Sequence, residues 1–254
     1  MKGENGEAIV SDTDEIYEIL HTVCGGSVYS CQDTIREGYI PFGGTRIGVS
    51  GSGIIVDGKY AGQHKITSLA IRIPFFAENA ADGALGYIRE KGFMSAMGIL
   101  AVSPPNCGKT TFLRALAKGL SLPAEYGGFS KRVCIIDERG ELYDKEHMRG
   151  CLCDVISGVP KIQALEMAIR TMSPEVVVLD EMGNENITGL LCKAYSGGVN
   201  VAASVHGNGV RDVLYGRELR NAVSRGVFST AYIMEENSAV KPGQIADLMK
   251  VVTE

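Results

Sequence analysis

The strongest chemical signal in the chain is a short loop rich in proline, glycine, lysine and threonine. Residues 103–110 read Ser-Pro-Pro-Asn-Cys-Gly-Lys-Thr, and the apolar run 97–102 leads directly into them. This order is typical of a P-loop, which lies between a strand and a helix and binds phosphates through backbone N–H groups and the positive helix N-terminus. It predicts binding of ATP with Mg²⁺. The residues that we expect around the nucleotide are Ser103, Pro104, Pro105, Asn106, Cys107, Gly108, Lys109, Thr110 and Thr111.

Two side chains of the loop have specific chemical roles. We expect Lys109 to supply a cation to the β- and γ-phosphates, and Thr110 to offer its hydroxyl to Mg²⁺. We expect the helix to begin at Thr111. Ser103 stands where the P-loop pattern has its first glycine. The two prolines that follow restrict φ, and could pre-set the turn that glycine would otherwise permit.

Two predicted strands end in acidic pairs, Asp137-Glu138 and Asp180-Glu181. A carboxylate at a strand end beside a P-loop can hold a magnesium-bound water, and its neighbour can deprotonate the attacking water. We therefore assign Asp180 to the magnesium shell and Glu181 to water activation. The alternative is that either pair is a polar strand exit.

A histidine follows the next predicted strand, 199–205. A single histidine in this position is usually a turn or core residue. Because His206 lies on the strand after the Asp180-Glu181 pair, it is also a candidate γ-phosphate sensor.

The elements that must position these residues alternate between strands and helices. Apolar, β-branched runs at 97–102, 133–136, 176–179 and 199–205 are separated by helical patterns at 112–120, 161–171 and 187–195. Continuous apolar strands of this kind indicate a parallel sheet with helices on both faces. Upstream, helical spacing at 12–37 is followed by glycine-broken strands at 42–59 and 68–73. We therefore expect an α/β fold with a small N-terminal α/β domain, 1–76, and a P-loop NTPase (RecA-like) domain, 77–254.

Composition narrows the class of protein. The 254 residues carry a net charge of −5, which gives no support to a nucleic-acid partner. The seven cysteines are irregularly spaced and do not suggest a disulfide framework. Cys151 and Cys153 near His147 are a weaker candidate for a metal site than for buried thiols. No apolar run is long enough to span a membrane, and the polar N-terminus is not typical of a signal peptide. We expect a cytoplasmic location, with recruitment to a membrane complex through partners.

In combination, these motifs resemble one family. Ser-Pro-Pro-x-Cys-Gly-Lys-Thr-Thr, Ile-Asp-Glu-Arg-Gly-Glu, Met-Ser-Pro-Glu-Val-Val-Val-Leu-Asp-Glu and Val-His-Gly occur here in the order found in the stage III sporulation AA family. That family is related to the ATPases of type II and type IV secretion systems. The segments 42–49 and 71–73 also resemble its N-terminal region. The resemblance covers roughly residues 15–235, and the tail 235–254 matches nothing that we can place.

The resemblance implies further roles. Serine at position 103 is normal in the family. Segment 137–141 resembles the acidic box of secretion ATPases, in which a carboxylate also faces the nucleotide, and Glu138 and Glu141 are at the matching positions. His206 resembles the histidine of their His box, which implies a role at the γ-phosphate. The family is expected to form a hexameric ring. It would power a channel complex between mother cell and forespore together with membrane-bound sporulation proteins.

Arginines are the remaining candidates for catalysis. None lies within the P-loop or beside Asp180 along the sequence, whereas an extra arginine commonly stabilises the phosphoryl-transfer transition state. In the related secretion ATPases, arginines of the N-terminal domain reach the nucleotide. We therefore predict that Arg46 or Arg72 completes the site and that activity depends on assembly. The alternative is that both are solvated strand residues or salt-bridge partners.

Three functions compete on this basis. The leading one is a motor ATPase of the secretion type that drives assembly or transport at a membrane channel. A second is a nucleic-acid ATPase of the helicase-loader or translocase type, which the acidic charge disfavours. A third is a scaffold that binds ATP with little turnover, which Glu181 disfavours because a binding module needs no general base.

Overall fold

A computed structural model describes residues 12–42, 45–71, 77–182, 185–235 and 243–253. The chain divides into two compact units, Met1–Pro74 and Phe75–Glu254. The division falls two residues from the boundary expected at residue 76.

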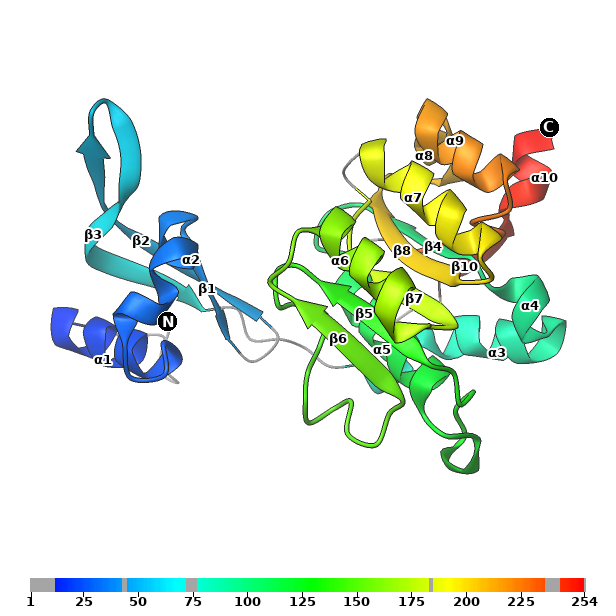
Figure 1. The fold of residues 1–254 in the computed structure, drawn as a ribbon, viewed down its shortest axis with the longest axis horizontal. Helices are drawn as coiled ribbons and strands as arrows, with labels where there is room; N and C mark the ends of the chain where they lie inside the picture. Colours follow the sequence, from blue (N-terminus) through cyan, green and yellow to red (C-terminus); the bar gives the residue numbers. More distant parts are fainter. Residues whose placement is uncertain (1–11, 43–44, 72–76, 183–184, 236–242, 254) are drawn as a thin grey trace. The chain divides into compact units, whose positions relative to one another are not determined.

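The N-terminal unit packs helices against a small antiparallel sheet (Figure 1). Asp12 caps the first helix: its carboxylate accepts from the Glu15 N–H at 2.9 Å, and the Glu15 side chain accepts from the Asp12 N–H at 3.3 Å. The sheet has the order β1-β2-β3. A buried cluster that includes Leu20, Ile40 and Val49 joins the helices to the sheet. The elements are α1 (Thr13–Val23), η1 (Val28–Cys31), α2 (Gln32–Arg36), β1 (Tyr39–Phe42), β2 (Thr45–Val56) and β3 (Lys59–Ile71).

The second unit is built on a sheet of seven described strands in the order β10-β9-β4-β8-β7-β5-β6. Neighbouring strands run parallel, except that β10 is antiparallel to β9. The strand β4, which precedes the P-loop, lies between β8 and β9, so the carboxyl end of β8 is beside the loop. The strands are β4 (Ile99–Ser103), β5 (Val133–Asp137), β6 (Cys153–Ser157), β7 (Val176–Leu179), β8 (Asn200–His206), β9 (Thr230–Ile233) and β10 (Gln244–Asp247).

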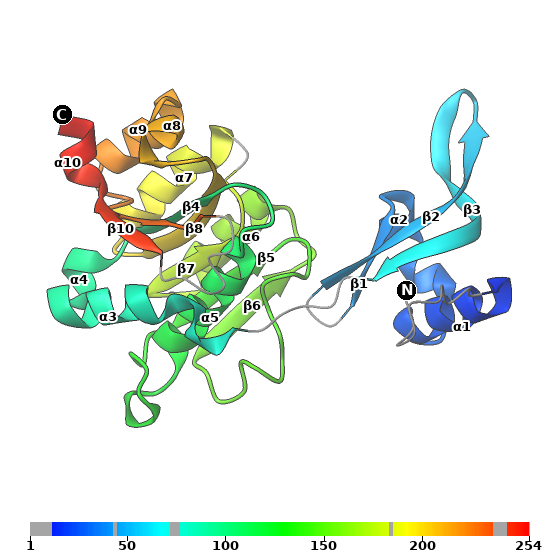
Figure 2. The same cartoon turned by 180° about the vertical axis from the view of Figure 1, so that it is seen from behind.

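Helices cover both faces of this sheet, as Figures 1 and 2 show. Successive residues of each strand point to opposite faces. Leu100 and Val102 therefore belong to one buried cluster, and Ile99 and Ala101 to the other. Helices α3 and α5 contribute to the second cluster, and α6, α7 and α9 to the first. This confirms the predicted α/β fold with a mostly parallel sheet between two helical layers.

The helices of the second unit begin with α3 (Asp82–Lys91) and the short α4 (Phe93–Ala96), followed by α5 (Lys109–Ser121), α6 (Lys161–Met167) and α7 (Glu185–Ser196). The described C-terminal part adds α8 (Val210–Leu214), α9 (Arg217–Ser224) and α10 (Leu248–Thr253). Short 3₁₀ helices lie at η2 (Glu78–Ala81) and η3 (Ala124–Tyr126), and a π-helical segment, η4 (Ala168–Met172), continues α6.

The structure differs from the sequence prediction at several places, and helices α3, α8 and α9 are among the elements that were not predicted. Helix α5 begins at Lys109 rather than at Thr111, so the loop lysine and both threonines lie in its first turn. The strands β6 and β9 were not predicted, because neither is a long apolar run. The tail that resembled nothing supplies β10, which pairs with β9, and then α10.

Two further expectations concern cysteines and the membrane. All seven cysteines are free thiols, and Cys134 and Cys153 lie on the neighbouring strands β5 and β6. Within the described part of the chain, no helix combines the length and apolar character that crossing a bilayer requires.

Candidate nucleotide-binding and hydrolysis site

The P-loop connects β4 to α5 through two residues with left-handed backbone. Asn106 has φ +61° and Gly108 has φ +85°, and asparagine and glycine are the residues that adopt this region most readily. Ser103, by contrast, is the last residue of β4 and pairs with His206 of β8. Its backbone is extended, which explains physically why serine suffices where the P-loop pattern has its first glycine.

Lys109 is buried against the backbone of this loop. Its ammonium donates to the Ser103 carbonyl at 3.1 Å and to the Pro104 carbonyl at 2.8 Å, and contacts His206 Nδ1 at 2.9 Å. Burial lowers the pKa of Lys109, while the negative charges of Asp180 and Glu181 oppose this shift. The lysine therefore lies where its charge can reach phosphates bound at the start of α5.

The hydroxyl of Thr110 and the carboxylate of Asp180 lie together, as the sequence predicted. Thr110 Oγ1 donates to Asp180 Oδ2 at 3.1 Å, and Ser204 Oγ donates to Asp180 Oδ1 at 2.7 Å. A hydroxyl and a carboxylate are hard oxygen donors, which is the ligand type that Mg²⁺ prefers. The residues present therefore fit a magnesium ion held from Thr110 and Asp180.

Glu181 has an unusual backbone for a glutamate, with φ +34°. Its N–H donates to Asp180 Oδ1 at 2.9 Å and to Ser204 Oγ at 3.1 Å. Its carboxylate lies 3.4 Å from His206 Nε2 and 3.9 Å from Arg139 Nη1. A non-glycine residue in this region of φ and ψ costs about 1 kcal/mol or more, so neighbouring contacts must hold it there.

His206 lies between Lys109 and Glu181. Because the lysine ammonium is always a donor when charged, His206 Nδ1 must accept the 2.9 Å hydrogen bond. In the neutral ring the proton then lies on Nε2, which faces the Glu181 carboxylate. The histidine thus connects the lysine predicted to bind phosphate to the glutamate assigned to water activation.

The two residues of the first acidic pair, Asp137 and Glu138, have different environments. Asp137 is buried, and its carboxylate accepts from the N–H groups of Glu141, Leu142 and Tyr143 at 2.7, 3.1 and 2.9 Å. It therefore shapes the loop that follows β5. Glu138, by contrast, lies 3.8 Å from the Lys161 ammonium and lines a cavity shared with Asp180 and Glu181.

This cavity brings together the carboxylates that sequence analysis selected. It also contains two cations that the sequence analysis did not assign, Arg139 and Lys161. No arginine lies beside Asp180 along the sequence, but Arg139 Nη1 lies 3.9 Å from Glu181 Oε2, because the residues after β5 lie beside the end of β7. Arg139 lies within segment 137–141, which resembles the acidic box, and this position in the sequence could have identified it. The lining residues are Ile136, Asp137, Glu138, Arg139, Glu141, Lys161, Asp180 and Glu181.

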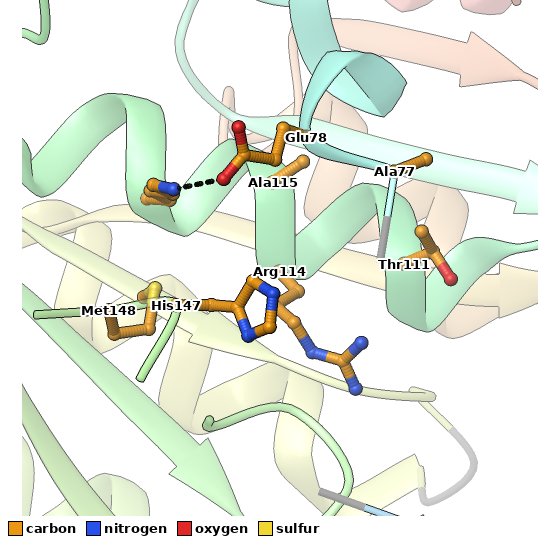
Figure 3. Close-up of a pocket in the computed structure, with 8 residues that line it drawn as sticks. Ala77, Glu78, Thr111, Arg114, Ala115, His147 and Met148 are labelled. Carbon is orange, nitrogen blue, oxygen red and sulfur yellow. Dashed lines mark hydrogen bonds and ion pairs between the residues drawn. The ribbon is translucent and has the colours of Figure 1, made fainter. Parts of the chain in front are cut away.

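Another cavity lies along α5, lined in part by Thr111, Arg114 and His147 (Figure 3). Arg114 is buried, and its guanidinium donates to the carbonyl of Leu142 at 3.1 Å and to the carbonyl of Glu141. The helix that begins with Lys109 and Thr110 is thereby connected to the loop that carries Glu138 and Arg139.

The two arginines that we predicted to complete the site, Arg46 and Arg72, belong to the first unit. Arg46 is on β2 in the first unit, where its guanidinium carbon is 4.6 Å from the centre of the Tyr39 ring. Arg72 lies outside the described residues. Their contribution to the site stays a prediction.

A comparison with solved structures supports the fold described for this chain. Among solved structures, the ATPase DotB of Legionella pneumophila matches with a TM-score of 0.57 over 89% of this chain at 14% identity, which shows the shared fold. This chain spans 65% of the length of DotB.

Sequence relatives identify the family. The stage III sporulation protein AA of Bacillus subtilis (strain 168) is 31% identical over 241 residues, which are 92% of this chain and 76% of the relative. The family model described as "Sporulation stage III, protein AA" matches residues 1–251. The chain therefore belongs to the stage III sporulation protein AA family, as its motifs indicated.

Proposed function

We propose that this chain is an ATPase that hydrolyses ATP to ADP and phosphate with Mg²⁺ as cofactor. One observation carries the proposal: the start of α5 and the ends of β7 and β8 form a set of linked contacts, in which Lys109 lies 2.9 Å from His206, His206 lies 3.4 Å from Glu181, and Thr110 lies 3.1 Å from Asp180. Each of these groups has a role in phosphoryl transfer to water. A single chain thus provides a cation for the phosphates, oxygen ligands for magnesium and a base for the attacking water.

The roles follow from the contacts. Lys109 and the N–H groups at the start of α5 hold the phosphates. Thr110 and Asp180 hold the magnesium ion, which neutralises charge on the β- and γ-phosphates. Glu181 orients the attacking water and takes its proton. His206, through its contact with Glu181 at Nε2, senses whether a γ-phosphate occupies the place beside Lys109.

We further propose that ATP hydrolysis drives a motor of the secretion-ATPase type. It works as a hexameric ring of identical chains at a membrane complex of sporulation proteins between mother cell and forespore. Family membership and the fold shared with the ATPase DotB support this step. We also propose that partner proteins recruit the chain to the membrane, as expected from its family.

The substitution Glu181→Gln tests the catalytic assignment. It keeps the shape of the side chain but removes the base, so ATP should still bind while turnover falls by about 10²–10⁴-fold. Calorimetric titration with ATP and measurement of phosphate release separate the two effects. Glu138→Gln is the matched control in the same cavity. If Glu181→Gln turns over at the wild-type rate while Glu138→Gln does not, the two glutamates have the reverse roles.

A further inference from the structure

Lys161 makes contacts that the function proposed above does not use. It is the first residue of α6, and its side chain is only 18% exposed. Its ammonium donates to the main-chain carbonyl of Glu181 at 3.0 Å and lies 3.8 Å from Glu138 Oε2. A lysine on a separate helix therefore joins the two carboxylate segments of the cavity.

The contact with Glu181 is to the backbone, at a residue whose backbone is strained. On one side of Glu181, Asp180 and Ser204 accept its N–H. On the other side, Lys161 donates to its carbonyl oxygen, and the Met182 N–H of the same peptide group donates to the Ser204 carbonyl at 2.8 Å. The two peptide groups that flank the Cα atom are thus both held, which is what a left-handed glutamate at φ +34° requires in order to persist.

The backbone conformation of Glu181 decides where its carboxylate points. With φ in the left-handed region, the side chain reaches His206 at 3.4 Å and Arg139 at 3.9 Å, across the mouth of the site. Without the contact from Lys161, the Glu181 carbonyl loses its charged donor, and only the Met182 N–H still restrains the peptide group after Glu181, so that the Glu181 backbone can relax. The carboxylate would then turn away from the position needed to activate water.

We propose that Lys161 is a positioning residue for water activation, which acts by holding the Glu181 backbone in its left-handed conformation. This proposal rests on the proposed ATPase function. It also explains how Glu138 is kept in the same cavity, because the lysine charge faces both segments. Lys161 itself does not contact the reacting atoms in this scheme.

The test is a double-mutant cycle on the full-length chain with Lys161→Met and Glu181→Gln. A misplaced catalytic group typically costs about 10²-fold in rate. We therefore expect Lys161→Met to lower kcat by about 10–100-fold, with KM and the dissociation constant for ATP little changed. Because the lysine acts through the glutamate, adding Lys161→Met to Glu181→Gln should lower the single-turnover rate no further. An additive loss, or a normal kcat in Lys161→Met, overturns the proposal.

Two variants control for general effects. Lys161→Arg keeps a charged donor and should retain turnover within about tenfold of the wild type. Lys131→Met removes a comparable lysine, 27% exposed and 2.9 Å from Glu175, away from the cavity, and should leave kcat unchanged. A kcat loss equal to that of Lys161→Met would reduce the effect to general destabilisation and overturn the proposal.

The outcomes separate this inference from the proposed function. If the wild-type chain binds ATP without hydrolysing it, the ATPase function fails, and the positioning role fails with it. If Glu181→Gln is slow and Lys161→Met is normal, the ATPase function stands and only the role of Lys161 fails.

Discussion

Replacing Asp137 by asparagine tests whether this carboxylate serves the fold of the site rather than its chemistry. The side chain is 3% exposed and accepts three backbone N–H groups. One carboxylate oxygen accepts from Glu141, and the other accepts from Leu142 and Tyr143. An asparagine of the same shape keeps one oxygen and places an NH₂ group where the other was.

The magnitude follows from that geometry. At least one N–H then faces a donor inside the protein, and the remaining bonds lose the charge of their acceptor. Hydrogen bonds to charged groups contribute about 1.5–3 kcal/mol each, and an unsatisfied buried donor costs about 1–3 kcal/mol. We expect Asp137→Asn to lower the free energy of unfolding by about 2–4 kcal/mol.

Urea unfolding followed by far-ultraviolet circular dichroism measures this loss. The control is Asp154→Asn, the same substitution at an exposed position of the neighbouring strand β6, which should change stability by less than about 0.5 kcal/mol. If Asp137→Asn unfolds within about 0.5 kcal/mol of the wild type, the loop does not depend on this carboxylate, and the reasoning is refuted. Turnover should also fall in the folded variant, because the loop carries Glu138 and Arg139.

Other substitutions test the remaining groups. Lys109→Ala should abolish tight ATP binding in a folded chain, and an unchanged affinity by calorimetry would contradict the P-loop assignment. Thr110→Val should remove most of the gain in ATP affinity that Mg²⁺ provides, as titrations with and without the ion would show. Arg46→Ala should lower turnover far more than ATP affinity, in a protein whose specific activity rises with concentration; a concentration-independent rate that survives the substitution argues against this role. Burial raises the pKa of the Cys134 thiol to about 11, so at pH 8 iodoacetamide should modify it about 100-fold more slowly than a free thiol. The raised folded-state pKa also means that this thiol stabilises the fold below about pH 9, and that the contribution is lost as the pH rises from about 9 to 11.

The residues that sequence analysis selected share a local signature. The P-loop, the pair at Asp180 and Glu181, and His206 each directly follow an apolar strand, and the carboxyl ends of parallel strands meet at one edge of a sheet. Contacts such as that of Thr110 with Asp180 could therefore be predicted without knowing the strand order.

The residues that were missed depend on strand order and on backbone detail. Lys161 reaches the site because β6 lies beside β5 at the edge of the sheet and delivers α6 to it, and β6 has no strong apolar pattern. Asp137 and Glu138 look equivalent in the sequence, but the alternation along β5 places Asp137 on the buried α5 side of the sheet, together with Ile135. Segment 137–141 signalled an acidic box, but not which acid shapes the loop.

The position of β4 in the sheet has a consequence for biosynthesis. This strand is the first of its sheet to leave the ribosome, yet Ile99 pairs with Ala202 on one side and with Thr230 on the other. Pairing between such distant segments is slow, because a long loop must close before any contact compensates for it. Until β8 and β9 are synthesised, both edges of the strand that leads into the P-loop remain open to incorrect pairing. The nascent chain therefore gains its candidate nucleotide site late, and a chaperone that shields a growing sheet would be needed most during synthesis of residues 104–230.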